Sequence, residues 1–77
     1  MEPAQAFGRA LRQRRRDAKL SQEKLALEAG VERVYVSWLE TGKRQPTFHT
    51  IVKLAGVLGC SAADLVADAE LLLLSSQ

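Results

Sequence analysis

The stretch LSQEKLALEAGVERVYVSWLETGKRQP, residues 20–46, determines the fold expected for this chain. Ser21 is placed to cap the free backbone N–H groups at the start of a helix over about 22–29. Gly30 follows at the position where a left-handed residue commonly ends a helix. A second short helix is expected over about 33–41. The stretch therefore predicts two short helices joined by a tight turn.

Two helices joined in this way form a helix-turn-helix, which places its second helix in the major groove of DNA. Val36 and Leu39 are expected to point inward and hold that helix against the core, which turns its other side chains toward solvent. A basic loop with Lys43 and Arg44 follows the second helix. The pattern predicts a DNA-binding unit over about residues 21–41.

The same residues resemble the phage repressor/Cro-like helix-turn-helix family, of the xenobiotic-response-element type. Single-domain members of this family include the controller proteins of restriction–modification systems. The resemblance covers residues 7–65 and rests on LSQEKLA, EAGV, YVSWLETGKRQP and TFHTIVKLAGVLGCSAADL. It implies a lambda-repressor-like domain that binds double-stranded DNA.

Helical periodicity predicts three further helices, and no segment alternates as a strand does. The first covers about residues 3–17, Thr47 can cap the fourth, and Ser61 with Asp64 forms a capping box for a fifth near 62–69. The fold class expected is therefore all-α, a compact five-helix bundle. The buried face of the first helix is expected to carry Phe7, Ala10, Leu11 and Ala18.

Length and composition predict one domain. We expect a helix-turn-helix domain over residues 1–70 and an apolar C-terminal tail over 71–77. The longest apolar run, residues 71–74, is far shorter than the roughly 20 residues that span a bilayer. The N-terminus shows no secretory signal, and a single cysteine cannot form an internal disulfide. A cytoplasmic location and no membrane partner are the expectation.

Charge is distributed unevenly along the chain. Residues 1–44 hold ten Lys and Arg against six Asp and Glu, a net charge of +4, whereas residues 45–77 carry a net charge of −2. The basic half contains the helix-turn-helix. A polyanion partner fits this asymmetry, because neutralising phosphates releases counterions and supplies most non-specific affinity.

Base readout is assigned to the exposed side of the second helix of the motif. The guanidinium of Arg33 can bond guanine O6 and N7 together, worth about 1–3 kcal/mol of discrimination. The alternative for Arg33 is a solvated surface arginine. The complete set predicted to read bases is Arg33, Val34, Ser37 and Trp38.

Trp38 leaves two interpretations open. A tryptophan at helical spacing is usually buried in the core, because its large surface dominates burial energetics. The matching position in the family faces DNA, which favours partial exposure with a contact to the groove or the backbone. The ring of Tyr35 is expected to pack sideways while its hydroxyl reaches a phosphate.

Phosphate contacts are expected from the edges of the motif. Gln22 opens a helix, where free N–H groups and the helix dipole favour an anion, and the resemblance implies that it touches the DNA backbone. Lys43 and Arg44 lie in a flexible loop and suit phosphate anchoring. The alternative is a charged loop that only keeps the protein in solution.

Residues 14–16 are three consecutive arginines, which cannot share one helical face. The resemblance implies that Arg15 pairs with Glu40 in a partly buried structural salt bridge. Arg12, Arg14 and Arg16 are expected to remain solvated or weakly DNA-proximal charges.

Self-association is expected, because one helix-turn-helix reads only a few base pairs. Two copies related by a two-fold axis predict an operator of two inverted half-sites. Four adjacent leucines cannot all be buried on one side of a helix within a monomer, so we expect them to contact a second copy. The alternative to such an interface is a frayed terminus. The predicted dimer interface is Val66, Leu71, Leu72, Leu73 and Leu74.

The leading hypothesis is thus a sequence-specific transcriptional regulator that acts as a homodimer. An antitoxin that binds a toxin protein and autoregulates its operon is the alternative, and an RNA-binding or purely structural module is a weaker one. No enzyme is expected, because Cys60 and His49 lack groups to orient them and supply too few ligands for a metal. No cofactor, metal or small-molecule ligand is implied.

Overall fold

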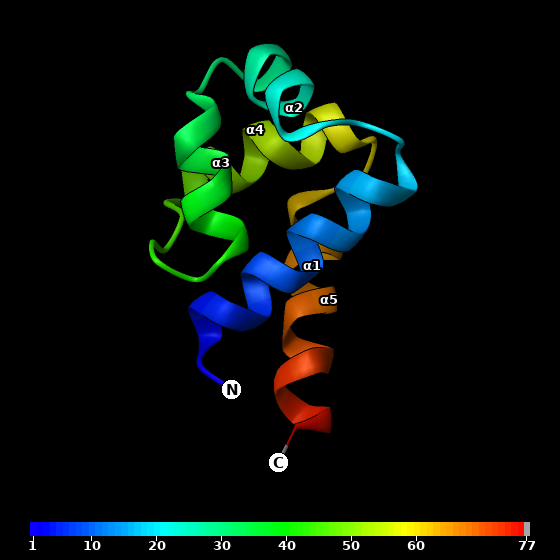
Figure 1. Ribbon diagram of the computed structural model, residues 1–77. Coiled ribbons are helices and arrows are strands. Elements are labelled where there is room, and N and C mark those ends of the chain that lie inside the picture. The colour runs from blue at the N-terminus through cyan, green and yellow to red at the C-terminus, as the bar shows by residue number, and fades with distance from the viewer. Residues whose placement is uncertain (77) are drawn as a thin grey trace.

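The computed structural model describes residues 1–76, and five helices make up most of this part of the chain (Figure 1). It contains no strand within that range, so the predicted all-α, five-helix architecture is confirmed. The helices are α1 (Pro3–Asp17), α2 (Gln22–Ala29), α3 (Arg33–Glu40), α4 (Phe48–Leu58) and α5 (Ala62–Ser75).

Local sequence signals set where most helices start. Ser21 Oγ accepts the backbone N–H of Lys24 at 3.0 Å at the start of α2, and Thr47 caps α4 in the same way. The predicted capping box opens α5: Ser61 accepts the Asp64 N–H at 2.9 Å, while its own N–H donates to the Asp64 carboxylate at 3.1 Å. This backbone donor lowers the pKa of Asp64.

Helix α5 extends further than expected. The sequence predicts a helix near residues 62–69, whereas α5 runs on to Ser75, so most of the predicted apolar tail is helical. Gln77, the last residue of that tail, lies outside the described residues. Leu72 and Leu73 pack against the core, which explains why the helix continues past Glu70.

The core lies where all five helices meet. Ala18, expected on the buried face of α1, is exposed, because α1 ends at Asp17 and Ala18 is already in the turn that follows. The other three residues predicted for that face are buried. The core consists of Ala6, Phe7, Ala10, Leu11, Leu25, Ala26, Ala29, Val36, Leu39, Leu54, Ala55, Leu65 and Ala69.

Gly8 lets α1 and α3 approach closely. A Cβ added to Gly8 would overlap the backbone carbonyl oxygen of Leu39 and would lie 2.6 Å from that of Glu40. Only a residue without a side chain fits there, since backbone atoms cannot swing aside. Helix α1 thus fixes the C-terminal end of α3 directly, and it packs against α5 along another side (Figure 1).

None of the helices in residues 1–76 is both long enough and apolar enough to cross a membrane.

Candidate nucleic-acid interface

Helices α2 and α3 are joined by the tight turn that the sequence predicts. Gly30 has φ 71°, the left-handed conformation, and Val31 donates its backbone N–H to the Ala26 carbonyl at 3.0 Å. Glu32 precedes α3, and its exposed side chain makes no capping hydrogen bond. Its carboxylate is thus free to complement the positive end of the α3 dipole.

Helix α3 is anchored on one face and open on the other. Val36 and Leu39 are fully buried and Glu40 is 7% exposed, so these residues fix the helix against the core. The four residues predicted to read bases lie outside this buried face. Arg33 and Val34 are exposed, and Ser37 and Trp38 are half-buried. Their contact with DNA remains a prediction.

Trp38 is partly exposed and carries a cation on its ring. The guanidinium carbon of Arg44 lies 5.1 Å from the ring centroid, a cation–π arrangement that we call the Trp38–Arg44 stack. Lys43 and Arg44 also donate their backbone N–H groups to the Trp38 carbonyl, at 2.9 and 3.4 Å. Full burial of Trp38 is therefore wrong. The loop expected to be flexible is tied to the end of α3.

Tyr35 is half-buried and packs against the core. Whether its hydroxyl reaches a phosphate remains a prediction.

Arg15 and Glu40 form the ion pair that the resemblance implies. Arg15 Nε donates to Glu40 Oε2 at 2.6 Å and Nη2 donates to Oε1 at 3.0 Å, while Nη1 donates to the Leu20 carbonyl at 2.8 Å. The two side chains are 11% and 2% exposed. The hydrogen bond to Glu40 raises the pKa of Arg15 above its ordinary value. The pair joins α1 to α3 from within the protein.

Gln22 takes part in the same network. Its Nε2 donates to Glu40 Oε1 at 3.1 Å, which places the first residue of α2 against the last residue of α3. The side chain is only half-buried, and the first N–H groups of a helix have no partner inside it. The predicted phosphate contact is not tested by this geometry, but the amide is already oriented by Glu40.

Arg14 is not the solvated charge that was expected. Its Nε donates to Asp68 Oδ2 at 2.6 Å, and the two side chains are 34% and 35% exposed. Asp68 comes from α5, 54 residues further along the chain, and no spacing rule could have paired them. The ion pair joins α1 to α5. Of the three consecutive arginines, Arg14 therefore pairs with Asp68, Arg15 pairs with Glu40, and Arg16 is exposed to solvent.

The residues predicted for the dimer interface point to different sides of α5. Leu72 and Leu73 are partly buried against the core of their own molecule. Val66, Leu71 and Leu74 are exposed by 44%, 65% and 62%. Phe48 and Val52 of α4 are exposed as well, and the sequence pattern did not single them out.

Cys60 and His49 are not brought together into a reactive site. Cys60 is partly buried against the core, which raises the pKa of its thiol, whereas His49 is exposed. Within residues 1–76 no group of three or more His, Cys, Asp and Glu side chains is placed to hold a metal ion.

Known proteins share this sequence pattern. A family model described as a helix-turn-helix domain matches residues 6–69. Control protein C.BamHI of Bacillus amyloliquefaciens is 39% identical over 61 residues, which cover 78% of this chain and 75% of that protein.

Two solved structures agree in fold. The clp gene regulator ClgR of C. glutamicum superimposes with a TM-score of 0.87 at 30% identity, covering 91% of this chain and 90% of that one. The restriction-modification controller protein C.AhdI of Aeromonas hydrophila gives a TM-score of 0.79 at 39% identity, covering 80% of this chain and 94% of that one.

Proposed function

This chain belongs to the helix-turn-helix family of DNA-binding transcriptional regulators, and from that premise we propose that it binds an inverted-repeat operator as a homodimer. In this proposal α3 is the recognition helix and enters the major groove. A cytoplasmic location is part of the proposal, and the family points to DNA binding rather than to catalysis.

The observation that carries the proposal is the outer face of α3. Arg33, Val34 and Ser37 lie outside the face that Val36 and Leu39 bury, so their side chains are available without any rearrangement of the core. Arg33 stands at the first turn of α3, the part of a recognition helix that reaches base edges. Arg33, Val34, Ser37 and Trp38 are therefore proposed to read the sequence.

Phosphate contacts are proposed from residues around that face. Gln22 begins α2, where the helix dipole favours an anion, and Glu40 orients its amide. Lys43 and Arg44 lie in the loop that follows the last residue of α3. The Trp38–Arg44 stack limits the motion of the Arg44 side chain, so less conformational freedom is lost when it meets a phosphate. Tyr35 is proposed to donate its hydroxyl to a further phosphate.

Dimerisation is proposed to use the side of α5 that carries Val66. Val66 and Leu73 line a shallow groove of about 270 Å³ together with Ile51 of α4. Val66 is 44% exposed, Ile51 and Leu73 are partly exposed, and apolar surface gathered at one place marks a contact that excludes water on association. Two copies joined by a two-fold axis must then hold their two α3 helices about 34–36 Å apart to meet successive major grooves.

Duplex binding by two variants tests the proposed roles. Arg33→Ala is expected to reduce the preference for a selected operator over random DNA. It should lower the binding free energy for the selected duplex by about 1–3 kcal/mol and leave that for random DNA unchanged. Lys43→Ala should weaken both duplexes alike and flatten the dependence of log K on log salt by about one.

Fluorescence anisotropy over a range of salt concentrations measures both effects. Equal losses for Arg33→Ala on selected and random duplexes would remove Arg33 from base readout.

A further inference from the structure

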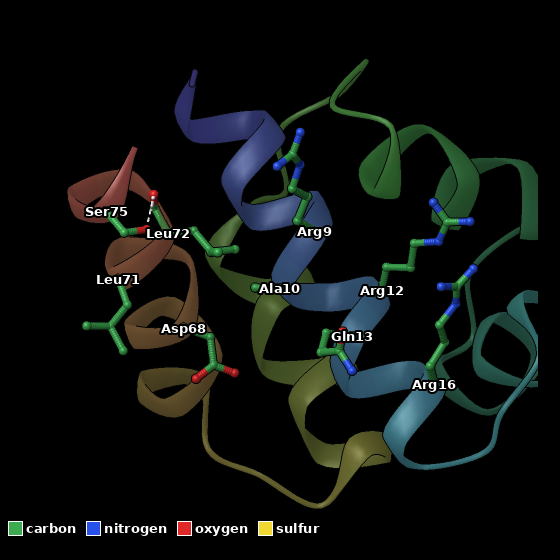
Figure 2. A pocket seen from close by; sticks show the side chains of 9 residues that line it. All are labelled: Arg9, Ala10, Arg12, Gln13, Arg16, Asp68, Leu71, Leu72 and Ser75. Atoms are coloured by element: carbon green, nitrogen blue, oxygen red, sulfur yellow. Dashed lines mark hydrogen bonds between the residues drawn. The ribbon is translucent and has the colours of Figure 1, made fainter. Parts of the chain in front are cut away.

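A groove of about 750 Å³ runs between α1 and α5 (Figure 2). This groove lies on a different side of α5 from Val66, because residues at different positions within a helical turn point in different directions. Leu72 points from α5 toward α1 in Figure 2, and Leu71 stands at the outer edge. The groove is lined by Arg9, Ala10, Arg12, Gln13, Arg16, Asp68, Leu71, Leu72 and Ser75.

Three arginines of α1 give the groove its charge. Arg9, Arg12 and Arg16 are exposed and follow one another at the i, i+3, i+7 spacing that places side chains on one helical face. In the described part of the chain no carboxylate lies within ion-pair distance of these three side chains. The one acidic residue that lines the groove, Asp68, is already paired with Arg14. The groove therefore carries uncompensated positive charge.

The same groove is apolar on its α5 side. Leu71 is 65% exposed, and Leu72, which packs against the core, lines the groove together with Ala10 of α1. A ligand that fills this groove must offer apolar surface and negative charge side by side. A DNA backbone offers the charge without the apolar surface, so the leucines favour a different ligand.

We propose that this groove binds an acidic amphipathic helix of a partner protein. Residues 9–16 rise by about 10 Å along α1, which matches two turns of a bound helix. Carboxylates at helical spacing on that segment would face Arg9, Arg12 and Arg16, and its leucines would cover Leu71. This is the helix-in-groove mode of recognition, with charge setting the orientation.

A second copy of this chain fits the groove less well. Its most acidic helix is α5, but Asp68 is bound to Arg14 and Asp64 caps its own helix. Glu70 lies on the opposite side of α5, where it lines the shallow groove beside Val66. A copy of α5 therefore has few carboxylates to offer to three arginines, whereas a separate acidic helix can offer a full stripe.

A designed peptide tests the proposal. The probe is a fluorescein-labelled, end-blocked peptide of Ala, Leu and Glu, about 18 residues long because shorter helices are marginal in water. Its Leu and Glu residues form adjacent stripes at i, i+3/i+4, i+7 spacing. We expect saturable one-to-one binding in anisotropy titrations that weakens as salt is raised. A peptide of the same composition with the stripes shuffled should bind at least tenfold more weakly.

Variants of the full chain locate the binding. The combined substitution Arg9→Ala, Arg12→Ala and Arg16→Ala should weaken peptide binding more than tenfold. Leu71→Ser, which changes no charge, should weaken it several-fold. Arg33→Ala removes an exposed arginine outside the groove and serves as the matched control, with peptide affinity kept within twofold. Thermal melts verify folding, which is expected because the altered side chains are exposed.

Three results would overturn the proposal. The first is the absence of saturable binding by the striped peptide, and the second is peptide binding that survives the groove substitutions. The third is binding of duplex DNA or phosphatidylglycerol vesicles that depends on Leu71 while the peptide does not bind. None of these results involves Arg33 or the face of α3, so operator binding is tested separately by the duplex-binding variants.

Discussion

Glu40 connects three helices through a single side chain. Its two carboxylate oxygens accept hydrogen bonds from Arg15 of α1 and from Gln22 of α2, while its own backbone ends α3. A carboxylate that is 2% exposed requires such partners, because an unpaired buried charge is strongly destabilising. The relative positions of α2 and α3, on which the proposed DNA-binding face depends, therefore rest on this network.

Arg15→Ala is expected to lower the free energy of unfolding by about 3–5 kcal/mol, because it leaves the Glu40 carboxylate buried without its cation. Urea or thermal unfolding measures the loss. Arg14→Ala is the matched control on the same helix: its pair with Asp68 is one-third exposed, so the change should be small. An Arg15→Ala protein as stable as the wild type would contradict the structural role of the pair.

Trp38 lies on the proposed DNA-binding face and, as the only tryptophan in the chain, gives a fluorescence signal from that face alone. Its half-buried ring is expected to lose contact with water when a duplex covers α3, so its fluorescence emission should shift to shorter wavelength on binding. A titration with duplex DNA, with Arg33→Ala as a weaker-binding comparison, measures the shift. An unchanged spectrum under saturating duplex would place Trp38 outside the interface.

Single residues show how far sequence reasoning extends. Arg33, Val34 and Leu39 could be assigned to opposite faces because helical periodicity alone sets their directions. The Arg14–Asp68 pair and the Trp38–Arg44 stack could not be predicted in this way. Both depend on how segments that are distant in sequence, or that are not helical, pack against each other. The spacing of residues along a helix does not determine that packing.

At the scale of helices, the approach of α1 to α3 depends on Gly8. Gly8→Ala is expected to destabilise the protein by about 1–3 kcal/mol, because its Cβ would overlap backbone oxygens that cannot move away. Gly56→Ala is the matched control in α4. A Cβ added to Gly56 has nothing within 4 Å, so this change should stabilise by about 0.5–1 kcal/mol through helix propensity.

Thermal melts of the two variants measure opposite shifts. Equal midpoints for Gly8→Ala and the wild type would mean that the close α1–α3 contact is not required.

Helix starts were predictable and one helix end was not. Ser21, Thr47 and Ser61 cap their own helices within three residues, so a local pattern is sufficient to locate them. The end of α5 has no such signal. It is set by Leu72 and Leu73 packing on the rest of the molecule, a contact that forms only once α1 and α5 lie side by side.

At the scale of the whole molecule, α5 offers two surfaces. The stripe with Val66 and Leu73 adjoins α4, and the stripe with Leu71 and Leu72 adjoins the arginines of α1. The first carries little charge and suits a second copy, whereas the second suits an acidic partner. One terminal helix thereby accounts for both proposed protein contacts.

Val66→Glu is expected to weaken self-association by at least tenfold, because it buries a charge at the proposed dimer contact. Sedimentation equilibrium measures this dissociation constant. Leu27→Glu is the control, since Leu27 is 73% exposed on α2, away from α5, and an unchanged dimer is expected. Wild-type self-association in the Val66→Glu protein would move the interface elsewhere.

Selection of bound duplexes from a random pool examines DNA recognition and two-fold symmetry in one measurement. We expect an enriched site made of two inverted half-sites whose centres lie about one helical turn, 10–10.5 base pairs, apart or a multiple of it. The same selection with Arg33→Ala should keep this symmetry and lose preference at one position in each half-site. A pool that yields no enriched sequence, or an enriched site without two-fold symmetry, would contradict a homodimer that reads DNA through α3.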